Sequence, residues 1–484
     1  MLTRRKLVTN AAALVASAAA LRSFKSPARA EISVPMKVQR AGAAPLLLEI
    51  AERPTALPCF GGAKLPLWTF QDGSDFPVLR VRAGERFEAI VKNGLTRPGE
   101  HVTIHWHGLR IPNREDGVAY LTQDPIQPGT EGRYAFTPPD TGTYFFHTHC
   151  NSVEHFGRGL VGVLIVEGDE VAPSDHELVL LMKDWRLSPD KAFLPFTTDE
   201  GAAKAGTAGT VRAINGITKP VYAVPASANV RMRLLNVDPA RISEIGIEGA
   251  DAAIIAVDGN PCAPIKLDSW RFGPSQRLDI LMRSPKAGET VKLIDYFSVT
   301  PVVLAEFTAE GKPLRRDRFS AKPLKYGRAR AADRKIAERV PFEFSATATG
   351  KAIADLAQAG IGLEIGSLCL SKRSFWAINK QAWSNSDNKM LGPPLAHLKK
   401  GNSYIFELKN LTPHAHPIHI HGHTFEVLTS SLRKILTHRA DTVLLLPKER
   451  LEIAFVADNP GKWMFHCHIL EHQETGMMGH FDVA

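Results

Sequence analysis

A short pattern occurs three times along this chain of 484 residues, and it restricts the folds that the chain can adopt. Each copy has a strand-like run that ends in Asn and, after a short connection, a second run that alternates apolar residues and ends in Gly. The three copies span Val91–Gly108, Leu234–Gly249 and Leu408–Gly422. A second landmark occurs twice, because Gly142–His149 and Gly461–His468 match in their glycine, aromatic and histidine positions. Repeats of this kind indicate related structural modules, which we expect to number three.

The runs between these landmarks are typical of short β-strands. Segments such as Phe87–Val91 and Tyr404–Leu408 alternate in polarity and are separated by Gly and Pro turns, the pattern of β-sandwiches. The helical signal is weak and local, for example near Ala352–Gln358. The length also exceeds what one core usually organises. We therefore expect three sandwich domains at residues 31–170, 171–310 and 335–484, with the Arg- and Lys-rich stretch 311–334 as a linker.

The N-terminus has the features of an export signal. Thr3-Arg4-Arg5-Lys6 precedes an Ala-rich run, and Ala28-Arg29-Ala30 supplies a small-residue cleavage site. The paired arginines resemble the twin-arginine signal. The apolar run is shorter than the roughly 20 residues that a membrane span needs, which argues against an anchor. We expect residues 1–30 to be removed during export to a bacterial periplasm by the twin-arginine machinery, leaving no membrane span in the mature chain.

The net charge of +9 depends on that segment, since residues 1–30 hold six basic residues and no acidic one. The rest of the chain carries 53 basic residues against 50 acidic residues, so it is close to neutral. We therefore expect no nucleic-acid partner.

The five cysteines are too few for a disulfide framework in a chain of this length. Cys467 belongs to a metal motif, as described below. The other four could form up to two disulfides or remain thiols, and the sequence does not choose between these. We interpret Cys150, next to His149, as a buried inert thiol rather than a redox group.

Eight of the 18 histidines form four His-x-His pairs at equivalent places in the repeated landmarks. On a strand, residues i and i+2 point to the same face, so each pair presents two imidazoles in one direction. Imidazole is a preferred ligand of copper, zinc and iron. One such pair is often only polar surface, but four pairs at equivalent places in two related modules predict a metal centre. The pairs are His105/His107, His147/His149, His419/His421 and His466/His468.

A second ligand set surrounds Cys467, which lies between His466 and His468 and therefore points to the opposite face of its strand. Two histidines, one cysteine and a weak methionine select a blue-copper electron-transfer centre. Zinc would not require the thioether, and an iron–sulfur cluster would need more cysteines. The set is His416, Cys467, His472 and Met477.

Together these segments resemble, in order and spacing, the four copper-binding motifs of the multicopper oxidases. The segments are His105–Gly108, His147–His149, His416–His423 and His466–His468 with His472 and Met477. The match covers both outer thirds of the chain, whereas the middle third matches only in its repeat frame. The resemblance implies an all-β fold of three cupredoxin-like Greek-key β-sandwich domains. In that fold the outer two share a trinuclear copper cluster and the middle one is a spacer without copper.

The resemblance also implies four coppers per chain, each with assigned ligands. The type 1 copper would be held by His416, Cys467, His472 and Met477. The type 2 copper would be held by His105 and His419. The type 3 pair would be held by His107, His147, His149, His421, His466 and His468. Electrons would pass from Cys467 to the cluster through the two adjoining histidines, and the other eight histidines would not be ligands.

Reduction of O₂ to water consumes protons, so we expect a titratable group beside the cluster. Asp116 resembles the acid that such enzymes place there, although Asp116-Gly117 is also a good turn dipeptide. Relatives often carry Glu directly after the last type 1 histidine. This chain has Gln473 there with Glu474 next, so Glu474 is the second candidate for proton delivery.

The resemblance implies a laccase-like oxidase that removes single electrons from phenols or aromatic amines in a shallow pocket near His472 and reduces O₂ to water. The alternative is a cuprous-ion oxidase for copper tolerance. Such enzymes commonly carry a Met-rich insertion, whereas the nine methionines here form no cluster beyond Met477-Met478. A non-catalytic protein on this fold would lack the ligands, and a copper nitrite reductase would have two domains. We expect a monomer whose partners are a small aromatic reductant and O₂.

Overall fold

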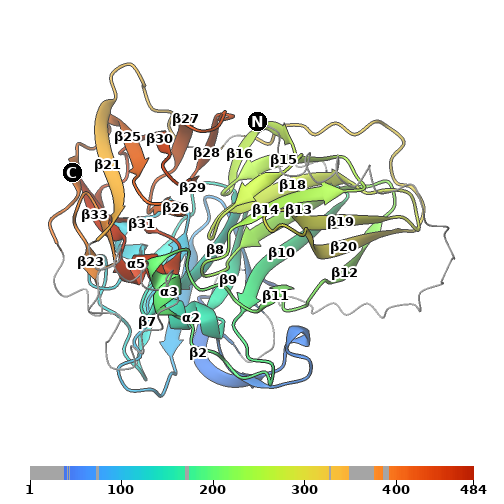
Figure 1. Ribbon diagram of the computed structural model, residues 1–484, viewed down its shortest axis with the longest axis horizontal. Coiled ribbons are helices and arrows are strands. Elements are labelled where there is room, and N and C mark those ends of the chain that lie inside the picture. Colours follow the sequence, from blue (N-terminus) through green and yellow to red (C-terminus); the bar gives the residue numbers. More distant parts are fainter. Residues whose placement is uncertain are drawn as a thin grey trace.

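The computed structural model describes residues 38–40, 42, 44–71, 76–168, 174–325, 327, 329–347, 375–384 and 392–484. The predicted signal peptide at 1–30, the helical signal near Ala352–Gln358 and Cys369 lie outside these residues. Strands dominate the described chain, as the sequence predicts (Figure 1). No helix within the described ranges combines the length and the apolar character that crossing a membrane requires.

The first third forms two sheets around one apolar core. Its strands are β1 (Val38–Arg40), β2 (Leu46–Thr55), β3 (Leu65–Thr69), β4 (Val78–Arg82), β5 (Phe87–Asn93), β6 (Ile104–His107), β7 (Glu131–Phe136), β8 (Gly142–Thr148) and β9 (Val161–Glu167). Its helices are η1 (Pro58–Phe60), η2 (Asn113–Glu115) and α2 (Ser152–Arg158). The strand orders are β1-β4-β9-β8-β6 and β3-β2-β5-β7. Ile50 of one sheet and Trp106 and Phe146 of the other belong to one buried cluster, as in a β-sandwich.

The middle third repeats this arrangement without His-x-His pairs. Its elements are β10 (His176–Trp185), α3 (Asp199–Ala203), β11 (Val211–Ile214), β12 (Val221–Pro225), β13 (Asn229–Asn236), β14 (Ser243–Glu248), β15 (Ala252–Val257), β16 (Asn260–Lys266), β17 (Trp270–Phe272), β18 (Arg277–Arg283), β19 (Thr290–Asp295) and β20 (Val302–Glu310). The two sheets have the orders β11-β10-β13-β18-β15-β16 and β12-β20-β19-β14-β17. The described residues of 311–334 form no strand or helix, and Leu324 among them is buried against Ile255 and Leu281 of the middle sheets.

The last third forms the sheets β22-β21-β25-β30-β27-β28 and β24-β33-β31-β26-β29, with β23 and β32 as a short pair. Its elements are β21 (Glu338–Ala346), β22 (Trp376–Ile378), β23 (Trp383–Ser384), β24 (Ala396–Leu398), β25 (Ser403–Asn410), β26 (His416–Ile420), β27 (Phe425–Ser430), β28 (His438–Ala440), β29 (Thr442–Leu445), β30 (Arg450–Val456), β31 (Gly461–Cys467), α5 (Leu470–Glu474), β32 (Thr475–Gly476) and β33 (Met478–Val483).

The asparagine of the repeated pattern has the same structural role in all three copies. The side-chain oxygens of Asn93, Asn236 and Asn410 each accept a hydrogen bond from the backbone amide two residues later, at 3.1, 3.1 and 2.8 Å. Their amide groups donate to backbone carbonyls of neighbouring loops. Such a turn redirects the chain. In each copy it leads from a strand of one sheet (β5, β13, β25) to a strand of the other (β6, β14, β26).

Three short helices from the three parts of the chain gather at one place, where α2, α3 and α5 lie close together (Figure 1). The Glu474 carboxylate of α5 accepts a hydrogen bond from the Val153 amide of α2 at 3.0 Å. Glu471, also on α5, accepts one from the Thr207 hydroxyl just beyond α3 at 2.7 Å. Helix α5, which carries His472, is therefore bonded to both other parts of the molecule.

Candidate metal centre

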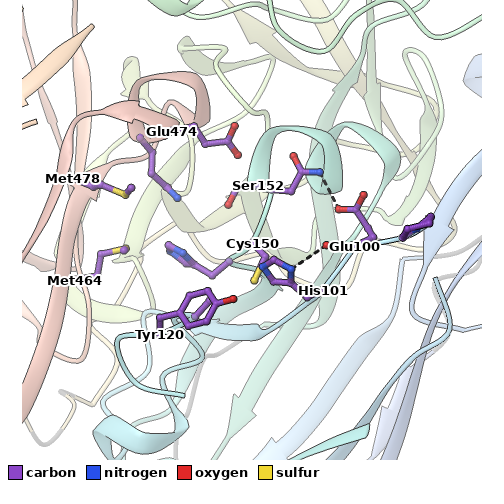
Figure 2. Close-up of a pocket in the computed structure, with 14 residues that line it drawn as sticks. Glu100, His101, Tyr120, Cys150, Ser152, Met464, Glu474 and Met478 are labelled. Atoms are coloured by element: carbon purple, nitrogen blue, oxygen red, sulfur yellow. Dashed lines mark hydrogen bonds between the residues drawn. The ribbon is translucent and has the colours of Figure 1, made fainter. Parts of the chain in front are cut away.

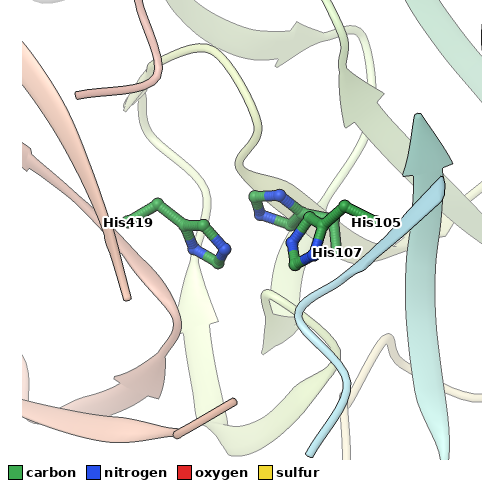
Figure 3. A group of neighbouring side chains, drawn as sticks. All are labelled: His105, His107 and His419. Carbon is green, nitrogen blue, oxygen red and sulfur yellow. The ribbon is translucent and has the colours of Figure 1, made fainter. Parts of the chain in front are cut away.

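The four His-x-His pairs lie on neighbouring strands of two sheets that approach each other. In the first part, His105 of β6 is paired with His147 of β8, and in the last part His419 of β26 is paired with His466 of β31. Figure 3 shows His419 reaching from the last part of the chain toward His105 and His107 of the first. The repeat thus places two equivalent pairs of histidine strands around one space.

The eight paired histidines form three groups in which the candidate ligand atoms lie within 4.8 Å of one another. The groups are His105/His107/His419, His107/His147/His468 and His149/His421/His466. The rings of His107 and His419 stack with centroids 3.8 Å apart, and those of His105 and His421 lie 3.9 Å apart. The structure therefore brings together all eight histidines that the sequence predicts for the cluster.

Three of these imidazoles are held in the neutral form that binds a metal. Burial, together with neighbouring histidines, holds the pKa values of His147, His149 and His468 well below the usual value, so these rings are neutral. Buried nitrogen atoms of most of the eight rings have no hydrogen-bond partner within the described chain, among them His105 Nε2, His149 Nε2 and His419 Nε2. Unpaired buried polar atoms are costly and rare. A cluster of metal ions would satisfy them, so the donor set fits copper.

Cys467 faces away from this cluster, as the alternation of its strand predicts. Its Sγ lies 3.7 Å from His416 Nδ1 and 3.6 Å from His472 Nδ1, and the two nitrogens are 3.1 Å apart. Burial raises the pKa of the Cys467 thiol, so a bound cation is needed to hold it as thiolate. Met477 is buried in the same apolar cluster as Cys467, and its amide donates to the His472 carbonyl at 2.8 Å. The structure thus brings together His416, Cys467 and His472 of the predicted type 1 set, and Met477 contacts Cys467 through the backbone, since its carbonyl accepts from the Cys467 amide at 3.0 Å.

The sequence predicts a shallow pocket near His472, and the ring of this histidine itself is fully buried. The indole of Trp376 covers it with ring centroids 4.5 Å apart and also contacts His416 at 5.2 Å. Trp376 is fixed in turn, because its Nε1 donates to the Ala202 carbonyl of α3 at 2.7 Å. A long-range contact between the middle and last parts of the chain therefore covers this histidine.

Asp116 is both a turn residue and a partner of the cluster. It follows η2 and precedes Gly117, where φ is +78° and a Cβ would lie 1.8 Å from the Ile104 carbonyl oxygen, so only glycine fits. The turn aims the carboxylate at His421, whose Nδ1 donates to Oδ2 at 2.9 Å. His105 Nδ1 donates to the Asp116 carbonyl at 2.8 Å.

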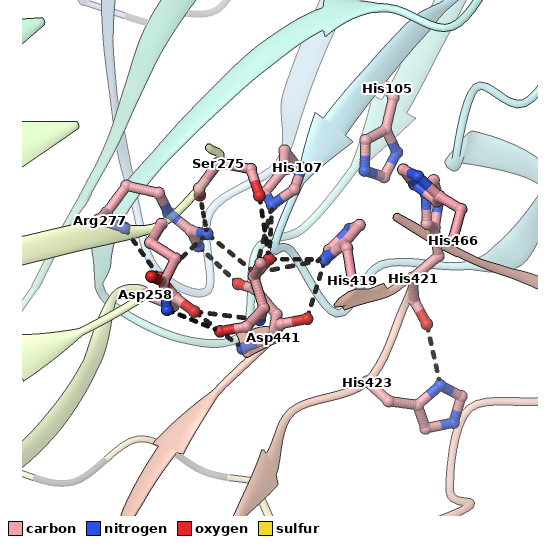
Figure 4. A network of polar contacts seen from close by, with 12 residues as sticks. His105, His107, Asp258, Ser275, Arg277, His419, His421, His423, Asp441 and His466 are labelled. Carbon is pink, nitrogen blue, oxygen red and sulfur yellow. Dashed lines mark hydrogen bonds and ion pairs between the residues drawn. The ribbon is translucent and has the colours of Figure 1, made fainter. Parts of the chain in front are cut away.

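Asp441 and Arg277 are site residues that the sequence did not reveal. Arg277 Nη1 and Nη2 donate to the Asp441 carboxylate at 2.8 and 2.6 Å, and the Asp441 carbonyl accepts from His419 Nδ1 at 2.9 Å (Figure 4). Asp441 Oδ1 also lies 3.2 Å from His107 Nε2. Arg277 comes from β18, so the middle part contributes a fully buried charge beside the cluster. The only sequence signal is Gly108, where a Cβ would lie 2.3 Å from Arg277 and 2.4 Å from Asp441.

Glu474 and Gln473 line a cavity of about 310 Å³ that reaches His149 (Figure 2). Burial and the nearby Glu471 raise the pKa of Glu474 to about 7, so this carboxyl can exchange a proton near neutral pH. Gln473 is buried, and its Oε1 has no partner among the described residues.

Within the described chain, the other histidines and cysteines are absent from the groups of candidate ligands. His155 is fully buried and lies 2.9 Å from Glu100 Oε1 and 2.7 Å from Thr148 Oγ1. The four cysteines of the described chain are buried and unpaired. Burial raises the pKa of Cys150 to about 12, which keeps it a thiol.

The comparisons with known proteins agree with this geometry. Three family models described as multicopper oxidase match residues 55–171, 176–291 and 371–484. A multicopper oxidase structure from Pseudomonas thermotolerans is 35% identical with a TM-score of 0.79, over 92% of this chain and all of that one. A multicopper oxidase of Mycobacterium tuberculosis is 27% identical over 87% of this chain and 84% of its own length. Laccase-2 of Botryotinia fuckeliana is 26% identical over 85% of this chain and 78% of its own. The strands, the cupredoxin-like sandwiches and these matches together show that the chain belongs to the multicopper oxidase family.

Proposed function

We propose that this copper-binding oxidase is a laccase-like enzyme with four coppers per chain, held by the residues that the motifs single out. His416, Cys467, His472 and Met477 hold type 1 copper, and His105 and His419 hold type 2 copper. The type 3 pair is held by His107, His147 and His468 on one side and by His149, His421 and His466 on the other. The observation that carries this division is the grouping of candidate ligand atoms into separate sets around one space and around Cys467.

When bound, copper supplies one-electron oxidation at the Cys467 site and four-electron reduction of O₂ to water at the cluster. The chain joins the two places covalently, because Cys467 lies between His466 and His468 on the same strand. Asp116 holds His421 in orientation and provides a carboxylate beside the ring. Asp441 likewise holds His107 and His419 in orientation and provides a carboxylate beside their rings. The Arg277 guanidinium keeps Asp441 ionised, because it holds the pKa of this carboxyl well below its usual value.

The reductant proposed is a small phenol or aromatic amine, with a cuprous ion as the alternative. The laccases among the similar proteins support the aromatic choice. O₂ uptake should be measured with a methoxyphenol, an aromatic amine and Cu(I) on protein whose copper content is known. Four coppers and faster uptake with the aromatics support the proposal. A colourless protein, or one loaded with zinc, contradicts it.

Three further predictions belong to this proposal. The chain is divided into a signal peptide at 1–30, domains at 31–170, 171–310 and 335–484, and a linker at 311–334. The three pairs of sheets support the three domains. The protein is exported to the periplasm by the twin-arginine machinery. It acts as a monomer.

Replacing Met477 with Leu should raise the potential of the type 1 copper. A thioether is a weak axial donor that stabilises Cu(II), and an alkyl side chain donates nothing. A tenfold loss of preference for Cu(II) corresponds to about 59 mV for one electron, and we expect a shift of that order. Redox titration of the blue absorption measures it, with Met282→Leu in the middle sandwich as the control. A lower potential in Met477→Leu would contradict the axial role.

Replacing Asp441 with Asn should destabilise the protein and empty part of the cluster. The change removes the nearer of the two carboxylates that face the fully buried Arg277, leaving Asp258 at 3.5 Å, and breaking a buried ion pair costs about 3–5 kcal/mol. Losing a residue that hydrogen-bonds to metal-binding histidines also lowers metal affinity about 10–100-fold. Urea unfolding and copper analysis measure the two effects. Asp124→Asn, at an exposed position, is the control. Normal stability and four coppers in Asp441→Asn would show that the pair is dispensable.

A further inference from the structure

The cavity at Glu474 connects the surface of the molecule with the cluster. Its volume is about 310 Å³, and its lining changes from exposed residues, among them Pro98, Gly99 and Asn151, to the buried His149. The paired histidines are all nearly or fully buried, so any ion that fills the cluster of the folded protein must pass through such an opening.

Two methionines form one wall at the buried end of this cavity. Met478 of β33 is paired with His466 of β31, and Met464 is two residues before His466, so all three side chains lie on the same face of the sheet. Diagonal neighbours of this kind are about 7–8 Å apart, within reach of two long side chains. Met464 and Met478 belong to one small buried cluster, and Figure 2 shows both sulfur atoms pointing into the cavity.

The alternation of the chain separates Met478 from its neighbour Met477. Met477 is buried in the apolar cluster that contains Cys467, whereas Met478 belongs to the separate cluster with Met464 and Trp383. The two adjacent methionines therefore serve different places, one at the candidate type 1 site and one at the cavity that leads to His149.

The chemistry of this wall is selective. Thioether sulfur is a soft donor that favours Cu(I) over the hard cations that carboxylates and water prefer. Dioxygen, water and protons need no sulfur, and an apolar wall could be built from leucine at little cost, because Leu and Met have similar volumes. Two thioether groups next to His466 can therefore bind a cuprous ion before it moves on to the histidines of the cluster.

We propose that Met464 and Met478 form a transient cuprous-ion site through which copper reaches the trinuclear cluster during metal loading. The inference rests on the proposed function, since it requires that the paired histidines hold copper. The step is a ligand exchange, in which the ion leaves the two sulfur atoms for imidazole nitrogen and its oxidation state does not change. The site deepens the function by giving the cluster its own loading route, separate from that of Cys467.

The first test follows loading of copper-free protein with Cu(I) under anaerobic conditions. Copper per chain is measured over time in samples freed of unbound metal, and the blue absorption that develops when a one-electron oxidant such as ferricyanide is then added reports the Cys467 site separately, because this oxidant does not require the cluster. In the double variant Met464→Leu/Met478→Leu we expect the cluster to fill at least tenfold more slowly while the Cys467 site fills at the wild-type rate. Met282→Leu is the matched control, because this methionine is equally buried but lies in the middle sandwich.

The second test uses Ag(I), a soft ion that does not undergo the copper redox cycle, on the fully loaded enzyme. We expect the double variant to bind one Ag(I) fewer per chain than the wild type and Met282→Leu, as measured by mass spectrometry under native conditions. Support requires both results. Equal Ag(I) binding, cluster filling at the wild-type rate, or equal slowing at the Cys467 site would each show that the methionines only fill space. Wild-type protein that takes up no cluster copper would instead overturn the proposed function.

Discussion

Replacing Cys467 with Ser should abolish the blue absorption of the loaded protein and nearly all turnover. The colour requires a thiolate–copper bond, and Sγ is the only sulfur within hydrogen-bond distance of both His416 and His472 in the described chain. A serine hydroxyl is a poor ligand for this copper. Turnover should fall by more than about a hundredfold. Losing even a residue that only contacts a metal ligand costs up to about a hundredfold, and Cys467 is itself a proposed ligand.

The cluster should keep its copper in this variant, because its histidines point away from Cys467 and remain in place. Copper analysis of Cys467→Ser should therefore give about three ions per chain instead of four, because only the type 1 site loses its thiolate ligand. Cys262→Ser provides the control, since Cys262 is a buried thiol of the middle sandwich that should leave colour and turnover unchanged. A blue Cys467→Ser protein would refute the assignment of the type 1 site.

Much of this site could be predicted because its geometry is local. The two-residue period of a strand alone places His466 and His468 on one face and Cys467 on the other. The Asn turn at Asn93 and Asn410 then delivers the equivalent strands β6 and β26 to equivalent places. Each of these relations spans only a few residues, so a repeat in the sequence becomes a repeat in space.

The parts that could not be predicted depend on contacts between distant segments. Arg277 reaches Asp441 across 164 positions, and a buried guanidinium looks like any other arginine in a sequence. Trp376 covers His472 because its indole is bonded to Ala202, 174 positions away. The sequence could not reveal this cover, since it depends on how the parts dock and not on any local pattern.

Replacing Asp116 with Asn should slow reoxidation of the enzyme by O₂ about a hundredfold, within the range that a proton-transferring group typically contributes. Four protons are consumed for each O₂ reduced to water, and ligating histidines cannot supply them. Asp116 is the buried carboxylate that accepts from His421 at 2.9 Å, whereas Gln473, on the cavity side, has an amide that does not titrate. Reduction of type 1 copper by substrate should stay fast, since Asp116 contacts the other site.

The comparison of two variants separates proton delivery from mere orientation of His421. Asn keeps an oxygen that can accept from Nδ1, so Asp116→Asn should retain all four coppers, whereas Asp116→Ala removes the acceptor and should lose cluster copper as well. Stopped-flow recovery of the blue absorption after reduction measures reoxidation, and Asp124→Asn is the exposed control. Gln473→Glu should restore part of the rate in the Asn background by adding a carboxyl to the cavity. If Asp116→Asn reoxidises at the wild-type rate, Asp116 only shapes its turn. Proton delivery then falls to Glu474, whose raised pKa of about 7 leaves a substantial fraction protonated at neutral pH.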